Sequence, residues 1–323
     1  MEHNLDFSFS GLRKRGCTPT DTVGVFYLAL ITLIFKMITL IKYKLAVSLF
    51  LLVFCFGSIY DGFAQAEQLR IISLAPATTE ILFALGLDKE IVGLSEFCNY
   101  PKEAVSKEKI GTFSQPNIEK ILSLKPDLIF CTGLEQSTAI AKLRQLGLNV
   151  FVSDPKNINE LFRSIREIGK LTSKEKESAA LIDGMKSRIK KINSKVSQIS
   201  EDKKQKVFIE IWHSPLTTVG RCSFINELVE LSGGINITSD IKSAYSSVAY
   251  EVVLKRNPDC IILAYMGNLS PIEQVMARPG WRNIAAVKNR RVYNDINPDS
   301  LLRPGPRVVE AVEELYKKLY LNE

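Results

Sequence analysis

The residue types that most often carry out catalysis are scarce in this sequence. Histidine occurs twice, and only His213 lies outside the first 66 residues. There is no G-x-S-x-G nucleophile motif, no phosphate-binding P-loop and no G-x-G-x-x-G fingerprint. Zinc and manganese sites usually draw on several histidines, so one histidine is at most a weak candidate axial ligand. We expect no enzymatic activity, no catalytic residue, no resident cofactor and no metal site.

The cysteines also lack a pattern that would indicate a metal or redox centre. None of the six forms a C-x-x-C pair, and two of them, Cys17 and Cys55, precede residue 66. In an oxidising compartment the others are compatible either with a disulfide or with free buried thiols. These other cysteines are Cys98, Cys131, Cys222 and Cys260.

Binding is a better match for the remaining residues. Aromatic and small residues gather in five segments that follow expected strands, and rigid aromatic faces suit a large, planar or partly apolar ligand. Core packing is the competing role for each ring taken alone. Arg303 can reach an anionic or amide group of a ligand, or it can hold its own turn. The five segments are 97–101, 111–113, 132–133, 212–215 and 244–246.

The positive charge of the chain does not indicate nucleic-acid binding. The net charge is +7, but the Lys and Arg residues are dispersed or mixed with Glu, as in residues 186–206. No zinc-finger spacing, RNA-binding motif or recognition-helix pattern is present. We therefore interpret the charge as that of solvated helix faces and expect no nucleic-acid partner.

Short apolar strands alternate with helices in two stretches, which predicts parallel sheets. Between these stretches a polar helix is expected from Ser173 to about Ser200, long enough at ~1.5 Å per residue to join two lobes. The predicted fold class is α/β, with two Rossmann-like lobes of mainly parallel sheets joined by one long backbone helix. The expected strands are 70–74, 90–94, 128–131, 150–153, 206–212, 260–265 and 291–293.

An internal repeat supports two related lobes. The segment from Glu119 to Ile129 matches the segment from Glu251 to Ile261 in Glu, Leu, Pro, Asp and Ile at a constant offset. The stretches from Glu80 to Gly86 and from Glu227 to Gly233 also correspond. The helix dipole alone would favour Glu119 and Glu251 in first turns. Their symmetric placement also suits one exposed acid per lobe that docks on a basic partner.

The first 66 residues read as a leader rather than as part of the fold. Two apolar runs, at 23–35 and 45–56, are each shorter than a spanning helix, and the second has the layout of a signal peptide ending near 64–66. Translation from Met37 fits this layout; an uncleaved membrane anchor is the alternative. The predicted domains are the leader 1–66, an N-terminal lobe 67–172, a linking helix 173–203 and a C-terminal lobe 204–323.

Five sequence segments together resemble the helical-backbone class of periplasmic binding proteins, and within it most resemble vitamin B12-binding proteins of ABC importers. The similarity covers nearly all of the chain after the leader. It implies a monomer exported to the periplasm, with limited closure on binding, that docks on an ABC permease dimer in the inner membrane. The segments are SLAPATTEILFALGL from Ser73, IVGLSEFCNYP from Ile91, IGTFSQPNIEKILSLKPDLI from Ile110, RPGWRNIAAVKNRRVY from Arg278 and RPGPR from Arg303.

This resemblance also implies roles for individual residues. Cobalamin or a related corrinoid is the expected ligand; a ferric siderophore, haem or another metal chelate is the alternative. The docking acids of the family match Glu119 and Glu251. Two departures affect the ligand site and a disulfide: Thr132 replaces an aromatic residue, and Ser232 and Tyr316 replace a cysteine pair. The expected ligand-binding residues are Phe97, Phe113, Trp212, Tyr245 and Arg303.

Overall fold

The computed structural model describes residue 27 and residues 30–48, 68–265 and 272–321. Residues 1–67 and 68–323 form two separate compact units. In the first unit, residues 30–48 form one helix that runs through Lys36, where the sequence suggested a break between two apolar runs. None of the described helices has the combined length and hydropathy needed to cross a bilayer. Met37 lies within this helix, and the predicted cleavage site at 64–66 lies outside the described residues.

The first lobe of the second unit is built on a four-stranded parallel sheet in the order β2-β1-β3-β4. The strands are short and have β-branched residues that favour extended backbone; β1, β2 and β3 are mostly buried and β4 is partly buried. They are β1 (Ile71–Ser73), β2 (Ile91–Leu94), β3 (Leu128–Cys131) and β4 (Val150–Val152). The helices are α2 (Pro76–Ala84), α3 (Ile118–Ser123), α4 (Ser137–Gln145) and α5 (Ile158–Leu171).

The second lobe repeats this topology and adds two antiparallel strands. Strands β7, β5, β9 and β10 are paired in parallel in the same relative order as β2, β1, β3 and β4. Two further strands extend this sheet: β6 pairs antiparallel with the C-terminal half of β5, and β8 pairs antiparallel with β6. The strands are β5 (Lys206–His213), β6 (Leu216–Val219), β7 (Ile235–Asn236), β8 (Tyr245–Ser247), β9 (Cys260–Leu263) and β10 (Val292–Tyr293). The helices are α7 (Phe224–Leu231), α8 (Tyr250–Arg256), α9 (Ile272–Met276), α10 (Ala285–Lys288), α11 (Pro298–Leu302) and α12 (Val308–Tyr320).

The predicted repeat is visible in the backbone at the turns that enter β3 in the first lobe and β9 in the second. Asp127 exchanges two hydrogen bonds with the backbone of Arg70, at 2.7 and 2.9 Å. Asp259 does the same with Lys206, both at 2.8 Å. The aspartate therefore closes an equivalent turn in each lobe, because its side chain accepts the amide that starts the neighbouring strand.

Each sheet is covered on both faces, and one of these faces is shared between the lobes. Along β1 and β5 successive side chains point to opposite sides, so Ile71 and Val207 enter one continuous core. Ile72 enters a separate core in the first lobe, and Phe208 enters another in the second. The shared core also takes buried residues from α2, α5, α7 and α12.

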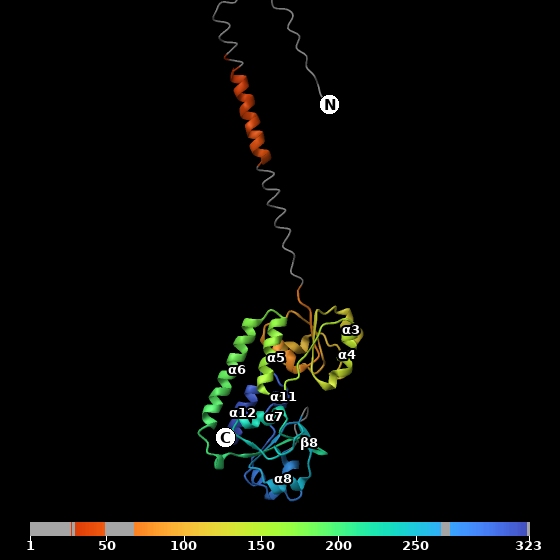
Figure 1. The fold of residues 1–323 in the computed structure, drawn as a ribbon, viewed down its shortest axis with the longest axis vertical. Helices are drawn as coiled ribbons and strands as arrows, with labels where there is room; N and C mark the ends of the chain where they lie inside the picture. Colours follow the sequence, from red (N-terminus) through yellow and green to blue (C-terminus); the bar gives the residue numbers. More distant parts are fainter. Residues whose placement is uncertain (1–26, 28–29, 49–67, 266–271, 322–323) are drawn as a thin grey trace, which may run out of the picture. The chain divides into compact units, whose positions relative to one another are not determined.

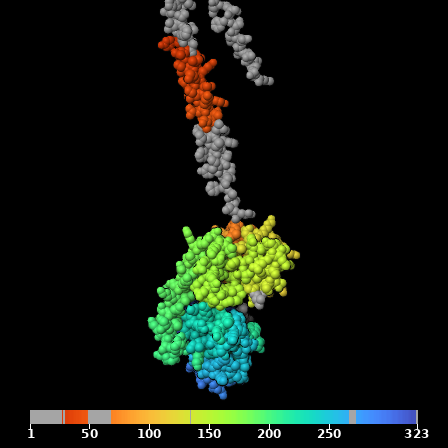
Figure 2. Space-filling view, in the orientation of Figure 1, coloured from red at the N-terminus to blue at the C-terminus, as the bar shows by residue number. Residues whose placement is uncertain are grey.

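The helix α6 (Glu175–Val196) runs along both lobes (Figure 1), and its surface is continuous with both in the space-filling view (Figure 2). It is shorter than predicted, because the chain turns at Ser173, which has a φ of 55°, and again after Val196. Its buried side chains Ile182, Met185, Ile189 and Ile192 belong to the shared core. The predicted fold class is confirmed, whereas the exact lobe boundaries stay predictions.

Candidate ligand-binding site

Three of the predicted ligand-binding aromatics lie at strand ends with about half of their surface exposed. Phe97 follows β2 and is 54% exposed, Trp212 lies near the end of β5 and is 47% exposed, and Tyr245 begins β8 and is 49% exposed. Phe97 and Trp212 lie at carboxyl ends of strands, where open α/β sheets hold ligands, whereas Tyr245 lies at the amino end of β8. Two of these rings come from the second lobe and one from the first.

Tyr245 lies within electrostatic range of charged residues of the first lobe. Its pKa is raised mainly by burial of the hydroxyl; Lys156 lowers it, and Glu135 and Asp154 raise it. These three charged residues lie just beyond the ends of β3 and β4. Lys156 and Asp154 form an ion pair at 2.6 Å. Strand ends of both lobes therefore share one electrostatic environment at Tyr245.

Phe113 is partly buried, and a buried glutamine fixes its backbone. The side-chain amide of Gln136 donates to the carbonyl oxygen of Phe113 at 2.7 Å and to that of Leu74 at 2.9 Å. Its carbonyl oxygen accepts the amide of Thr132 at 2.9 Å. Gln136 is 0% exposed, so one side chain holds the segments that follow β1 and β3 and the loop at Phe113.

Trp212 packs with His213 and Tyr265, and Tyr265 is hydrogen-bonded to a buried ion pair. Its ring centroid lies 5.0 Å from that of His213 and 6.3 Å from that of Tyr265. The Tyr265 hydroxyl donates to Glu210, which also accepts two hydrogen bonds from Arg278 at 2.6 and 2.7 Å. Glu210 is fully buried, so this pairing removes the cost of an isolated buried charge. The exposed rings of Trp212 and His213 therefore pack against Tyr265, whose position is fixed by its hydrogen bond to Glu210.

His213 is the one predicted metal-ligand candidate in this group, and its side chain is exposed beside Trp212. Among the residues that the structure describes, no three His, Cys, Asp or Glu side chains are grouped to hold a metal ion. An axial bond from His213 to the metal of a bound chelate would need only this one imidazole.

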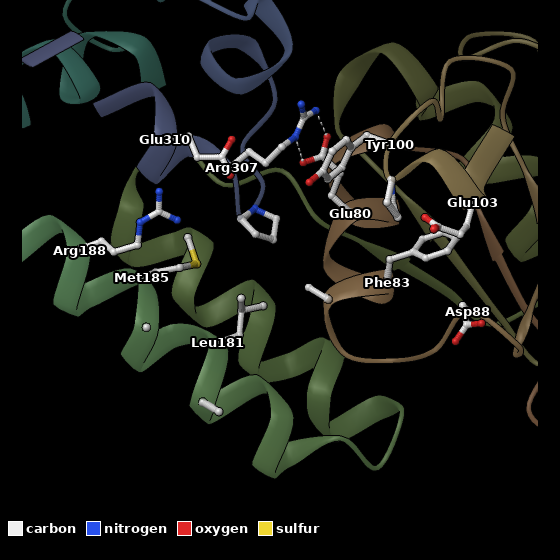
Figure 3. Close-up of a pocket in the computed structure, with 15 residues that line it drawn as sticks. Glu80, Phe83, Asp88, Tyr100, Glu103, Leu181, Met185, Arg188, Arg307 and Glu310 are labelled. Atoms are coloured by element: carbon white, nitrogen blue, oxygen red, sulfur yellow. Dashed lines mark hydrogen bonds and ion pairs between the residues drawn. The ribbon is translucent and has the colours of Figure 1, made fainter. Parts of the chain in front are cut away.

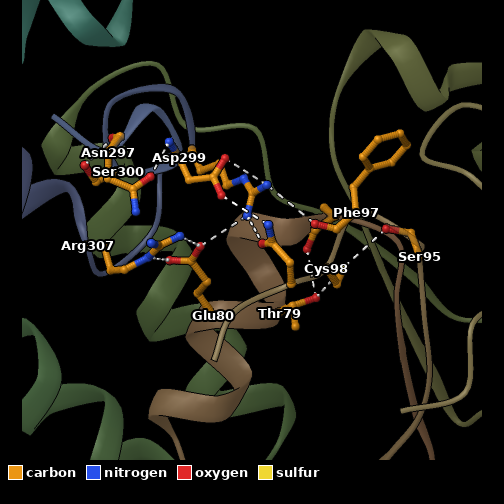
Figure 4. A network of polar contacts seen from close by, with 12 residues as sticks. Thr79, Glu80, Ser95, Phe97, Cys98, Asn297, Asp299, Ser300 and Arg307 are labelled. Carbon is orange, nitrogen blue, oxygen red and sulfur yellow. Dashed lines mark hydrogen bonds and ion pairs between the residues drawn. The ribbon is translucent and has the colours of Figure 1, made fainter. Parts of the chain in front are cut away.

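Arg303 connects the two lobes. Its guanidinium donates to the Asn99 side chain at 2.6 Å and to the Phe97 carbonyl at 3.5 Å, and it pairs with Asp299 at 2.9 Å. The neighbouring Arg307 makes a bidentate ion pair with Glu80 of α2 (Figure 4). Arg303 therefore ties its own turn to the loop that carries Phe97, which is the structural alternative considered for it. A ligand contact by Arg303 stays a prediction.

A cavity of about 700 Å³ lies elsewhere, between α2, the segment 100–103, α6 and the start of α12 (Figure 3). Its floor contains Phe83, Leu181 and Met185, and Arg307 and Glu80 form one wall. None of the predicted ligand-binding residues lines it. It faces the linking helix rather than strand ends, so the cavity does not mark the predicted ligand site.

The two predicted docking acids occupy equivalent, exposed positions. Glu119 is the second residue of α3 and Glu251 is the second residue of α8.

The four cysteines beyond the leader carry free thiols, and only Cys222 among them is exposed. Burial raises the pKa of Cys131 and of Cys260 to about 12, with smaller effects from neighbouring charges.

Sequence reasoning missed three residues that organise the site. Glu210 is an acidic residue with apolar residues on both sides in the middle of β5, a pattern that signals a buried partner. Its partner Arg278 lies in a quoted family segment, but nothing in the sequence pairs the two. Gln136 gives no local signal, because its three partners lie in three different segments.

Two lobes joined by a long helix, with exposed aromatic rings at the strand ends, define a two-lobed solute-binding protein. The family model for periplasmic binding proteins matches residues 71–297. The chain belongs to this family, as the resemblance predicted, and the family is one of solute-binding proteins.

Individual relatives extend the comparison. An ABC transporter substrate-binding lipoprotein of Bacillus subtilis, YvrC, is 37% identical over 265 residues, which cover 80% of this chain and 82% of the relative. The vitamin B12-binding protein of Vibrio cholerae is 32% identical over 247 residues, which cover 76% of this chain and 87% of the relative. A crystal structure of a possible iron-binding periplasmic protein from Staphylococcus epidermidis is 34% identical. Its TM-score is 0.69, and it covers 78% of this chain and 98% of that chain.

Proposed function

We propose that this chain is the substrate-binding protein of an ABC importer and that it binds cobalamin or a related corrinoid for delivery to the membrane permease. The observation that carries the proposal is the set of half-exposed rings of Phe97, Trp212 and Tyr245, presented by both lobes at strand ends. Such rings offer broad, stiff contact faces to a large, partly apolar ligand. The B12-binding relative from Vibrio cholerae supports this choice of ligand.

Calorimetric titration with cyanocobalamin tests the ligand. We expect saturable binding that Trp212→Ala or Phe113→Ala weakens about tenfold or more, because each ring contributes buried contact area. Leu146→Ala is the matched control, since Leu146 is 45% exposed at the end of α4 and outside the predicted site. Unchanged affinity in both aromatic variants would remove this placement of the ligand.

A second candidate ligand is haem or a ferric siderophore. His213 favours haem, because its exposed imidazole beside Trp212 can supply an axial nitrogen. The possible iron-binding relative is compatible with this alternative. Haem titration followed by absorption spectroscopy distinguishes the ligands: a haem spectrum that changes in His213→Ala, together with no heat from cyanocobalamin, would select haem.

We propose that Glu119 and Glu251 contact basic residues of the permease, one acid from each lobe. Both are exposed at equivalent helix starts, which places one negative charge on each lobe. The double variant Glu119→Ala, Glu251→Ala should keep its ligand affinity and lose at least ~10-fold in affinity for the permease in proteoliposomes. Glu103→Ala, Glu310→Ala makes the same charge change beside α6 and should dock normally. Impaired ligand binding with normal docking would contradict these roles.

Export to the periplasm as a monomer, with a signal peptide or an uncleaved anchor at residues 1–66, completes the proposal. Relatives described as periplasmic or as a lipoprotein support an extracytoplasmic location. Mass spectrometry of the protein from its host distinguishes the two leaders. A mature chain starting near residue 67 supports cleavage, whereas an intact leader in the membrane fraction supports the anchor.

A further inference from the structure

The buried pair of Glu210 and Arg278 has no counterpart in the first lobe. The register of the paired strands places Leu74 of the first lobe where Glu210 stands in the second, because Ile71 and Leu128 pair as Val207 and Cys260 do. Leu74 is fully buried in an apolar cluster, whereas Glu210 is a fully buried acid. A buried charge pair in one of two related lobes calls for a role specific to that lobe.

One side of this pair reaches the proposed ligand surface. Tyr265 is 6% exposed, and its hydroxyl donates to Glu210. Its ring lies edge-on to Trp212 and to His213, at centroid distances of 6.3 and 6.0 Å. A ligand that presses on the exposed face of Trp212 therefore acts on Tyr265 through direct packing.

The other side of the pair reaches the proposed docking helix. The Arg278 guanidinium lies 4.6 Å from the ring centroid of Trp281 and 5.5 Å from that of Tyr250. Tyr250 is the first residue of α8, directly before Glu251. Trp281 is fully buried, and its ring lies 5.8 Å from that of Tyr250. The contacts run without a gap from Trp212 through Tyr265, Glu210 and Arg278 to Tyr250.

Arg278 is suited to transmit a displacement because its guanidinium contacts a buried carboxylate and two aromatic rings. Both of its terminal nitrogens bind Glu210, and the rings of Trp281 and Tyr250 lie next to each other against its guanidinium. Burial alone would lower the pKa of Arg278, but its hydrogen bonds and charge interaction with Glu210 outweigh that effect and raise it. A rigid, permanently charged fork leaves little slack between its partners.

We propose that Arg278 is a positioning residue that couples ligand occupancy at Trp212 to the position of Tyr250 and Glu251, so that the loaded and empty protein present different docking surfaces. The contacts of Tyr265, Glu210, Arg278 and Tyr250 are called the Arg278 bridge. This inference rests on the proposed function. It assigns the signalling role to the second lobe alone, since the first lobe has Leu74 at the equivalent position.

The test uses the fact that the chain has only two tryptophans, one at each end of the Arg278 bridge. Protein labelled with 5-fluorotryptophan gives two ¹⁹F resonances, and Trp212→Phe assigns them. We expect cyanocobalamin, which is diamagnetic, to shift both resonances. In Arg278→Lys, which keeps the charge but loses the two-pronged pairing, the ligand should still shift the Trp212 resonance, while the ligand-induced shift of Trp281 is lost.

Two further variants separate coupling from folding defects. Tyr265→Phe keeps the ring and removes only the hydroxyl bond to Glu210, and should reduce the Trp281 response. Arg282→Lys changes an exposed arginine in the same turn and should leave both responses intact. A full Trp281 response in Arg278→Lys and in Tyr265→Phe would overturn the Arg278 bridge.

The remaining outcomes are equally decisive. A shift of Trp212 without one of Trp281 in the unaltered protein overturns the coupling and leaves the proposed ligand standing. No shift of either resonance, with no heat of binding, removes the proposed function and the coupling with it. Hydrogen exchange supplies a second readout: ligand should change exchange in residues 250–256 of α8 and leave residues 118–123 of α3 unchanged.

Discussion

Two glutamates in equivalent helices join the lobes in a crossed arrangement. Glu80 of α2 binds Arg307, which immediately precedes α12 in the second lobe. Glu227 of α7 accepts the amide of Ile158, the first residue of α5, at 2.8 Å. Burial raises the pKa of both glutamates, while their partners lower it. Each lobe thus places a carboxylate at the start of the other lobe's last helix, where the helix dipole favours a negative charge.

Removing the Glu80 carboxylate should therefore destabilise the protein strongly. Glu80→Ala leaves Arg307, which is 7% exposed, without its bidentate partner, and we expect the free energy of unfolding to fall by ~3–5 kcal/mol. Urea unfolding followed by circular dichroism measures this loss. Glu103→Ala removes an exposed carboxylate near the same cavity and should change stability by no more than ~0.5 kcal/mol. Equal effects of the two variants would contradict a structural role for the buried pair.

Residue patterns in the sequence predicted positions better than partners. The sequence marks Glu80 and Glu227 as repeat positions and predicts that the segments of Phe97, Trp212 and Tyr245 lie at strand ends. Glu210 and Arg278 are 68 residues apart, and Arg307 and Glu80 are 227 residues apart. A side-chain pair at such separation depends on packing of whole elements, which the local sequence does not encode. For the same reason, the sequence could not decide between a ligand contact and a structural role for Arg303. Its partners Asn99 and Phe97 lie in the other lobe.

At the scale of elements, the repeated helix-to-strand turn shows the same backbone conformation with different side chains. Lys125 and Asn257 both precede a proline and have φ values of 44° and 47°. Asparagine tolerates this left-handed region better than lysine does. The Asn257 side chain also accepts the amide of Ala285 at 2.8 Å, at the start of α10. Lys125 at the first of these turns forms hydrogen bonds through its backbone, to Leu122 and Arg70, so its side chain provides no such compensation.

Glycine should therefore improve the first turn and not the second. Lys125→Gly relieves the left-handed strain of a side-chain-bearing residue, and we expect a gain of ~0.5–1 kcal/mol. Lys125→Ala keeps the strain and should leave stability unchanged. Asn257→Gly gives up the bond to Ala285 and should gain nothing. Thermal unfolding of the three variants measures the differences. A stabilised Asn257→Gly or a neutral Lys125→Gly would show that this strain does not limit stability.

The predicted strands and long helix are present within a few residues, because buried parallel strands carry continuous β-branched runs. The antiparallel pair of β6 and β8 was not predicted. Their sequences, Leu-Thr-Thr-Val and Tyr-Ser-Ser, are short and rich in hydroxyl side chains, and the sequence predicts a loop around Tyr245 where the structure has β8. Cross-strand pairing specifies such strands more than intrinsic propensity does, so a partner strand is needed before they can be recognised. One consequence is that Tyr245 projects from a sheet rather than from a free loop.

At the scale of the whole molecule, the shared core makes the two lobes depend on each other. Ile71 of the first sheet, Val207 of the second and Ile189 of α6 all belong to one buried cluster. The resemblance predicted limited closure through the single linking helix, and the shared core gives a physical reason for it. Wide separation of the lobes would expose apolar surface to water, at a free-energy cost of ~25 cal/mol for each Å² exposed.

Because they share a core, the lobes should unfold together. Hydrogen exchange at increasing urea concentrations should give one midpoint for β1 and β3 of the first lobe and for β5 and β9 of the second. Ile189→Ala leaves a cavity where α6 meets the core and should lower stability by ~2–4 kcal/mol. Because that cavity borders both lobes, both midpoints should fall by the same amount. Leu122→Ala, at an exposed position of α3, should change neither. Distinct midpoints, or a shift confined to one lobe in Ile189→Ala, would mean that each lobe is stabilised independently.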